Sequence, residues 1–185
     1  MKRKGIFISK LDFHIHTSAS DGKYSPKVVT QKAVESGATI ISITDHWTFS
    51  GLRYLKDNDH IDDNLEVIPG IELEASPRVE MFHILGYFKD IPNRDAEREM
   101  ERVGRFDGDT QKKWASSIGI DQSDVEGAKE VIRIIRKYEG LPALAHPFTL
   151  ELQDTQLEDL VNSLIDAGLE GLEVYNSRDS TRDLA

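Results

Sequence analysis

The sequence predicts an α/β fold, either a parallel sheet or a barrel. Segments with strand periodicity alternate with amphipathic helical segments along most of the chain. Five of the six histidines fall within predicted strands or directly after them, which is where α/β barrels gather their functional side chains. The 185 residues suit one domain, 1–185, and contain no repeat or linker that would divide it.

The first half of the chain supplies four predicted strands and one helix. Residues 11–16 alternate apolar and polar side chains, which is the pattern of a strand with one polar face. A helix is predicted over 25–36, with a proline at its first position and a glycine after its end. The apolar, β-branched segment 39–44 predicts a strand covered on both faces. Residues 65–74 and 79–88 predict two further strands joined by a Ser-Pro turn.

The second half is predicted to begin with a helical insertion at about 93–139. Helical patterns within it cover 93–103, 111–117 and 123–138. A buried strand, a helix and a last strand are then predicted at 141–147, 156–167 and 169–176. The alternation of strands and helices therefore resumes after the insertion.

The composition excludes several classes of protein. Because cysteine is absent, disulfide frameworks, thiolate zinc sites and cysteine nucleophiles are ruled out, and any metal must bind histidine and carboxylate. The net charge of −10 disfavours an extended nucleic-acid surface, although divalent ions in a cleft would still allow a compact phosphate-bearing substrate. No apolar run approaches the ~18 residues of a membrane span and no signal peptide is evident. We therefore expect a soluble, cytoplasmic protein.

The polar face of the first predicted strand carries two histidines. His14 and His16 lie about 6.6 Å apart along the strand, close enough for both rings to reach one ion. Asp21 follows on a glycine-containing loop that can fold back over the strand end. The alternative is a pair of histidines packed in the polar interior of a barrel.

Acidic residues accompany the next two strands. Asp45 precedes His46 at the end of the strand 39–44, and we expect its carboxylate to orient the imidazole, unless it caps the next helix instead. Glu72 lies among apolar residues, where an unpaired carboxylate is costly to bury, so it needs a cation or hydrogen-bond donors. Glu74 has the same strand parity and competes for this role.

The other histidines divide into two kinds. His83 and His146 have apolar neighbours on predicted strands, so each is either a hydrogen-bonded core histidine or a metal ligand. His60 lies in a polar loop and is expected to be solvated.

Three arginines recur at helical spacing in the predicted insertion. Arg94, Arg98 and Arg102 share one helix face, and Arg98 or Arg102 is a candidate to bind a substrate phosphate. Interleaved glutamates favour the alternative of a solvated, salt-bridged helix. Phe106 and Trp114 either pack within the insertion or stack on a base.

The motifs HIHTSASDG, TDH, GIE, HILGYF, AHP and GLEVYN, in this order, resemble the PHP (polymerase and histidinol phosphatase) superfamily of metal-dependent phosphoesterases. The resemblance covers about 11–176 and looks closest to the free-standing nucleotide phosphoesterase branch. It implies a distorted (β/α)7-type barrel with two to three divalent ions at the strand ends. By position it assigns His14, His16 and Glu72 to one ion, Glu72, His83 and His146 to a second, and Asp21 and His46 to a third.

The resemblance further implies a hydrolase that cleaves phosphate esters with a metal-activated hydroxide, in which Asp45 and His46 are catalytic. Nucleotide phosphates, oligonucleotide ends and small phosphomonoesters are the implied substrates. Manganese, zinc and iron all suit imidazole and carboxylate ligands, and the choice among them stays open, as does the oligomeric state. Two alternatives are an amidohydrolase-like enzyme and a non-catalytic, metal-stabilised module.

The resemblance departs from the family pattern at its last motif. That pattern closes with a strand carrying a G-S-D-x-H motif, whose aspartate and histidine complete the first and third metal sites. The sequence stops at Ala185 before such a motif. We therefore expect a barrel that is incomplete at its C-terminal side and a weak third site, whether the chain is truncated, a partner supplies the strand or the site is degenerate.

Overall fold

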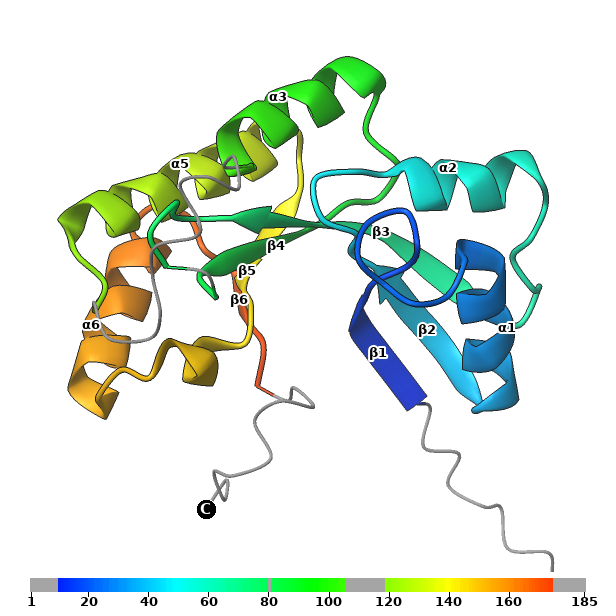
Figure 1. Ribbon diagram of the computed structural model, residues 1–185, viewed down its shortest axis with the longest axis horizontal. Coiled ribbons are helices and arrows are strands. Elements are labelled where there is room, and N and C mark those ends of the chain that lie inside the picture. The colour runs from blue at the N-terminus through cyan, green and yellow to red at the C-terminus, as the bar shows by residue number, and fades with distance from the viewer. Residues whose placement is uncertain (1–9, 80, 106–118, 175–185) are drawn as a thin grey trace, which may run out of the picture.

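The computed structural model describes residues 10–79, 81–105 and 119–174. Their strands form one curled six-stranded sheet, in the order β1-β2-β3-β4-β5-β6, which makes up part of a barrel wall (Figure 1). The strands are β1 (Lys10–Ile15), β2 (Ala38–Ile43), β3 (Glu66–Glu74), β4 (His83–Tyr87), β5 (Leu141–Leu144) and β6 (Gly171–Leu172). Within the described residues, the sheet is open between β1 and β6. The predicted α/β class and the incomplete barrel are confirmed.

Helices cover the outer, convex side of this sheet (Figure 1). They are α1 (Pro26–Glu35), α2 (Ser50–Asp57), α3 (Arg94–Gly104), α5 (Gln122–Lys137), the short 3₁₀ helix η1 (Pro147–Leu150) and α6 (Asp154–Ile165). Sequence signals explain their starts: Ser25 caps α1 ahead of Pro26, and the Asp121 side chain accepts hydrogen bonds from the first backbone amides of α5. The helix α2 was not among the predicted elements.

The direction of β4 differs from the predicted parallel arrangement. It runs antiparallel to both β3 and β5, whereas the other neighbouring strands are parallel. Only residues 75–82 separate β3 from β4, and a parallel connection needs a crossover of about a dozen residues or more. The short connection therefore reverses the chain.

The hydrophobic core lies between the sheet and its helices. Leu73 of β3 and Ile84 of β4 are fully buried there, together with Ile132 and Ile135 of α5. Because side chains alternate across a strand, Glu72 and Leu85 face the opposite, inner side of the sheet. The inner side thus carries Glu72 beside a small apolar cluster that includes Leu85.

The segment predicted as a helical insertion, 93–139, supplies α3 and α5, which pack against each other and against β3. The helix predicted at 111–117, and with it Phe106 and Trp114, lies outside the described residues. In the part of the chain that the structure describes, no helix has the length and apolar character needed to cross a bilayer.

Candidate metal centre

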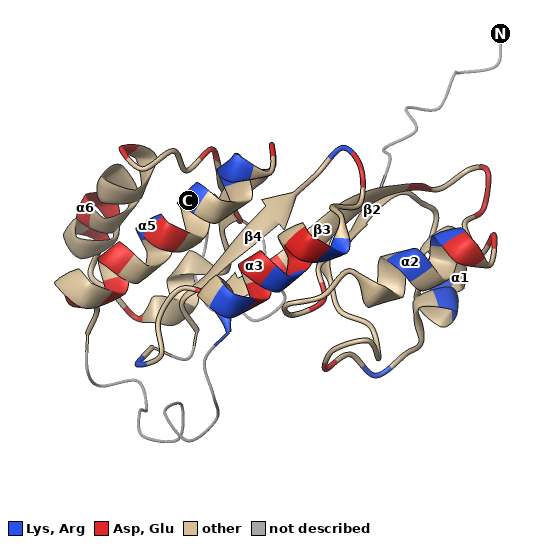
Figure 2. Cartoon of the chain, turned by 90° about the horizontal axis from the view of Figure 1, so that it is seen from above, with Lys and Arg blue, Asp and Glu red and all other residues tan. Residues whose placement is uncertain are grey.

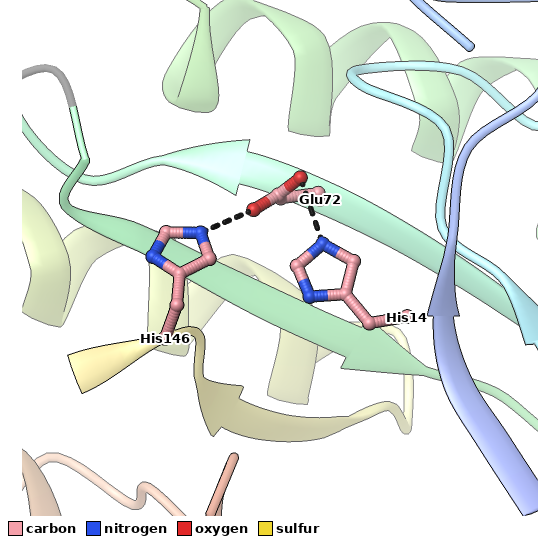
Figure 3. Close-up of side chains that lie close together, drawn as sticks. All are labelled: His14, Glu72 and His146. Atoms are coloured by element: carbon pink, nitrogen blue, oxygen red, sulfur yellow. Dashed lines mark hydrogen bonds and ion pairs between the residues drawn. The ribbon is translucent and has the colours of Figure 1, made fainter. Parts of the chain in front are cut away.

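A single buried carboxylate stands at the centre of the site. Glu72 of β3 is only 1% exposed, and each of its oxygens faces different imidazoles. Glu72 Oε1 lies 3.0 Å from His83 Nδ1 and 3.1 Å from His146 Nε2. Glu72 Oε2 lies 2.8 Å from His16 Nε2, 3.1 Å from His14 Nε2 and 3.4 Å from His46 Nε2. Figure 3 shows the carboxylate between the rings of His14 and His146.

The imidazole nitrogens also converge on one another. His14 Nε2 is 3.1 Å from His16 Nε2, and His83 Nδ1 is 3.3 Å from His146 Nε2. Two sets of ligand atoms are compact enough to hold an ion: His14, Glu72 and His146 form one, and His16, His46 and Glu72 form the other. Nitrogen atoms that crowd around one carboxylate, with no sulfur, form a donor set that fits manganese, zinc or iron. The residues present therefore fit a metal centre.

Strand geometry explains why the residues meet. His14 lies in β1 and His16 directly follows the strand, two residues on, so both rings lie on the inner side of the sheet, and a parallel bridge pairs His46 with Glu72. On the antiparallel pair, His83 lies opposite Glu74 and two positions along from the partner of Glu72. His146 follows β5 in a left-handed backbone conformation, with φ of 25°, which turns its ring inward.

The histidines of the cluster differ in pKa. Burial disfavours the charged form of His14, but hydrogen bonds to Glu173 and Glu72 raise its pKa to about 10. Burial lowers the pKa of His46 to about 4, with further lowering from the nearby imidazoles of His83 and His16, against the attraction of Glu72. Glu72 is deeply buried, which favours its neutral form, yet hydrogen bonds from four of the five histidines around it hold its pKa well below its usual value.

Asp21 lies at the solvent-exposed rim of this cluster. Its Oδ1 is 2.7 Å from His16 Nδ1, and its Oδ2 is 3.9 Å from His46 Nε2. The first contact turns the other nitrogen of His16 toward Glu72. The loop carrying Asp21 thus joins the rim of the site to the buried carboxylate.

The predicted contact from Asp45 to His46 is wrong. The Asp45 carboxylate accepts hydrogen bonds from the Thr17 backbone amide at 2.6 Å, the Thr17 hydroxyl at 2.7 Å and the Ser20 hydroxyl at 2.8 Å. His46 Nδ1 is buried and has no hydrogen-bond partner among the described residues. Adjacent residues of an extended chain point in opposite directions, so the two side chains diverge. Asp45 holds the loop that follows β1.

The arginines that were candidates to bind a substrate phosphate lie outside the cleft, and the alternative of a solvated, salt-bridged helix agrees with the structure. Arg98 and Arg102 are exposed, and Arg98 pairs with Asp95 at 2.8 Å. A cleft of about 690 Å³ opens beside His46 and His83, and α3 borders it with Glu97, Glu101 and Arg105 instead. Figure 2 shows acidic and basic residues interleaved along α3. The helical spacing identified a common face, but that face points to solvent.

Sequence reasoning assigned no role to Glu173, which follows β6. Its carboxylate oxygens both lie 3.2 Å from His14 Nδ1, and Oε2 accepts a 2.7 Å hydrogen bond from the His146 backbone amide. It therefore orients His14 and holds the strained residue His146. An acidic residue alternating with apolar ones in the predicted strand 169–176 was the available signal. His60 lies away from the cluster, beside the Tyr54 ring.

Comparison with known proteins decides the family. The sequence model of the PHP domain matches residues 12–182. The chain belongs to the PHP domain family. A 5'-3' exoribonuclease of Haemophilus influenzae is 29% identical over 141 residues, covering 74% of this chain and 45% of the relative. The 5'-3' exoribonuclease Rnm of Escherichia coli is 33% identical over 81 residues, covering 43% and 28%. The chain thus spans less than half the length of these curated relatives.

Two solved structures share the fold of this PHP domain. A Bifidobacterium adolescentis protein described as a candidate metal-dependent phosphoesterase has a TM-score of 0.61 at 19% identity, covering 91% of this chain and 78% of its own. An amidohydrolase from Chromobacterium violaceum, solved with sulfate and no metal, has a TM-score of 0.62 at 17% identity, covering 89% and 76%.

Proposed function

We propose that this PHP domain is a metal-dependent phosphoesterase. The observation that carries the proposal is the buried carboxylate of Glu72 beside a cleft: its Oε1 faces His83 and His146, and its Oε2 faces His14, His16 and His46. A carboxylate placed in this way suits two neighbouring divalent ions. The family membership of the chain supports the same activity.

We assign the ligands by the oxygen of Glu72 that each ring faces, which differs from the two compact sets of donor atoms, where His14 is grouped with His146 and His16 with His46. His14 and His16 would hold one ion together with Glu72 Oε2, and His83 and His146 would hold a second with Glu72 Oε1. Asp21 and His46, at the rim, would hold a third. Manganese, zinc and iron remain the candidate metals. When bound, divalent ions supply an activated water and neutralise charge on the phosphoryl oxygens.

Contacts within the chain set the protonation and the orientation of the proposed ligands. The lowered pKa of His46 favours its neutral ring, the form that offers a lone pair to an ion, whereas His14, whose pKa is raised to about 10, would release a proton when an ion binds. Glu173 orients His14, while the Thr149 hydroxyl lies 3.1 Å from His146 Nδ1, so both rings present their Nε2 atoms to Glu72. The cleft beside His46 and His83 gives a substrate access to the cluster.

Nucleotide phosphates and the ends of short oligonucleotides are the proposed substrates, with small phosphomonoesters as the alternative. The exoribonuclease names of the two bacterial relatives favour nucleic-acid ends. The net charge of −10 disfavours a long nucleic-acid footprint, so binding would rely on the cleft.

The test is hydrolysis of p-nitrophenyl phosphate by the purified chain with added manganese, before and after chelation. We expect turnover that needs metal and is lost in the Glu72→Gln variant, while Glu66→Gln, an exposed position on the same strand, behaves as wild type. Metal binding without hydrolysis of any phosphate ester would favour a non-catalytic module. Cleavage of amides rather than esters would favour an amidohydrolase-like enzyme.

A further inference from the structure

The ring of His46 is fixed differently from three other rings of the metal centre. His14, His16 and His146 each have a side-chain oxygen near the ring nitrogen that faces away from Glu72. The corresponding nitrogen of His46, Nδ1, is buried and has no hydrogen-bond partner among the described residues. The direction of this ring therefore depends on the backbone that carries it and on the rings packed around it.

The backbone on either side of His46 is held by the neighbouring strand β3. The Glu72 amide donates to the Asp45 carbonyl at 3.4 Å, and the Trp47 amide donates to the Glu72 carbonyl at 3.1 Å. Trp47 then adopts a left-handed backbone conformation, with φ of 59°, which is uncommon for a bulky residue. Such a conformation persists where the surrounding structure holds it, so the residues after Trp47 need an anchor.

Glu97 of α3 provides that anchor. Its Oε1 accepts a 2.9 Å hydrogen bond from the Thr48 hydroxyl and a 2.7 Å hydrogen bond from the Phe49 amide. Phe49 is the N-cap residue of α2, and Glu97 accepts from its amide as the glutamate of a capping box does, but from a different helix. Glu97 Oε2 pairs with Arg53 in the first turn of α2.

These contacts hold a buried carboxylate. Glu97 is 8% exposed, and three donors share its two oxygens. Hydrogen bonds to an ionised carboxylate are roughly twice as strong as neutral ones, and a buried donor that loses its acceptor is costly. The segment 47–49 is therefore fixed relative to α3.

We propose that Glu97 is a positioning residue for His46: it fixes the segment 47–49 so that His46 Nε2 faces the metal centre. The inference rests on the proposed function, in which His46 holds an ion at the rim. His46 Nε2 lies 3.4 Å from Glu72 Oε2, the longest of the five imidazole contacts to this carboxylate. Without Glu97, the segment 47–49 would relax, and the ion that needs His46 would bind more weakly.

The experiment is a double-mutant cycle on manganese binding to the metal-free protein, measured by isothermal titration calorimetry. His46→Ala defines which ion depends on His46. Glu97→Ala should weaken the binding of that ion by about tenfold, because a residue that orients a ligand is lost. In the His46→Ala background, Glu97→Ala should cause no further loss, since there is no imidazole left to position. Glu97→Gln keeps an acceptor oxygen for the Phe49 amide and should recover most of the affinity.

Glu101 supplies the matched control. It lies one turn further along α3 and lines the same cleft, but it pairs with Arg105. Glu101→Ala removes one negative charge from the cleft, as Glu97→Ala does. It should leave the affinity for the His46-dependent ion near that of the wild type.

The fluorescence of Trp47 tests the same inference in the absence of metal. The chain has two tryptophans, so a Trp114→Phe background leaves Trp47 as the reporter on the segment 47–49. Quenching by acrylamide should increase in Glu97→Ala and return toward the wild-type value in Glu97→Gln.

Several outcomes would overturn the inference: unchanged manganese binding in His46→Ala, additive losses in the double variant, or unchanged quenching in Glu97→Ala. Equal losses of affinity in Glu97→Ala and Glu101→Ala would also overturn it, because charge alone would then explain the effect. A wild-type chain that shows the expected cycle but hydrolyses no phosphate ester would refute the proposed function and leave the role of Glu97 intact.

Discussion

The two oxygens of Glu72 divide the site into halves that differ in access to solvent. The inner half, His83 and His146 around Oε1, has side chains only 10% and 4% exposed. The outer half, His14 and His16 around Oε2, adjoins the 66% exposed side chain of Asp21. His146 of the inner half is the most buried of these rings, whereas His16 of the outer half contacts the exposed Asp21, and His83 lines the cleft. We therefore expect the loss of His146 to disturb stability and metal retention, and the loss of His16 to disturb chemistry.

Removing the shared carboxylate should have the largest effect, because it breaks both halves. Glu72→Gln should lower kcat for p-nitrophenyl phosphate by about 10³-fold or more and reduce the bound metal, since both proposed ions lose a charged ligand. Elemental analysis and steady-state kinetics measure the two effects. Full metal content in this variant would show that Glu72 does not bridge.

The two halves can be compared through one histidine from each. His146→Ala should lower the unfolding free energy of the metal-free protein by about 1–3 kcal/mol, because it removes a buried hydrogen-bonded ring. His16→Ala should cost less stability and still abolish turnover. Urea unfolding monitored by circular dichroism checks the first result, with His60→Ala as the control. Equal stability losses would contradict the proposed division.

Glu173 joins the halves, because it contacts His14 and the backbone of His146. Glu173→Gln should weaken metal affinity by about 10–100-fold, since His14 loses the charged acceptor that orients it and makes its ring a stronger ligand. Titration with manganese measures the affinity, and at saturating metal the number of ions per chain should return to that of the wild type. Unchanged affinity would show that Glu173 has no role in metal binding.

The smallest effect on catalysis is expected at Asp45, which contacts the loop that follows β1 rather than the histidines. Asp45→Asn should lower the unfolding free energy by about 1–3 kcal/mol, because an amide cannot accept from all three donors of Thr17 and Ser20. With metal saturating, kcat of the folded variant should fall far less than in Glu72→Gln. Asp63→Asn, in an exposed loop, is the control for stability. A loss of turnover as large as that of Glu72→Gln would show that Asp45 takes part in the reaction.

Features that depend on residues close together in the sequence were predicted better than features that depend on residues far apart. Strand parity placed His14 and His16 on one face, and the buried carboxylate in an apolar strand correctly marked Glu72 as needing partners. Parity is a local property of the chain, so one sequence is enough to read it. The fold class was predictable for the same reason.

The features that the sequence did not predict depend on how separate helices and strands pack together. The spacing of Arg94, Arg98 and Arg102 defines a helix face, but the direction of that face depends on how α3 packs, which the spacing does not contain. The partners of Asp45 and Glu173 are distant in sequence and meet only because β1, β2 and β6 lie on one curled sheet. Similarly, the reversal of β4 depends on the length of a turn rather than on the strand pattern.

The most direct test of the central claim is electron paramagnetic resonance of the manganese-loaded protein, with the metal content measured on the same sample. Two ions joined by the Glu72 carboxylate should give the spectrum of an exchange-coupled manganese pair, and Glu72→Gln should convert it to the signal of isolated ions. A wild-type protein with only isolated manganese signals at full loading would contradict the bridging role of Glu72.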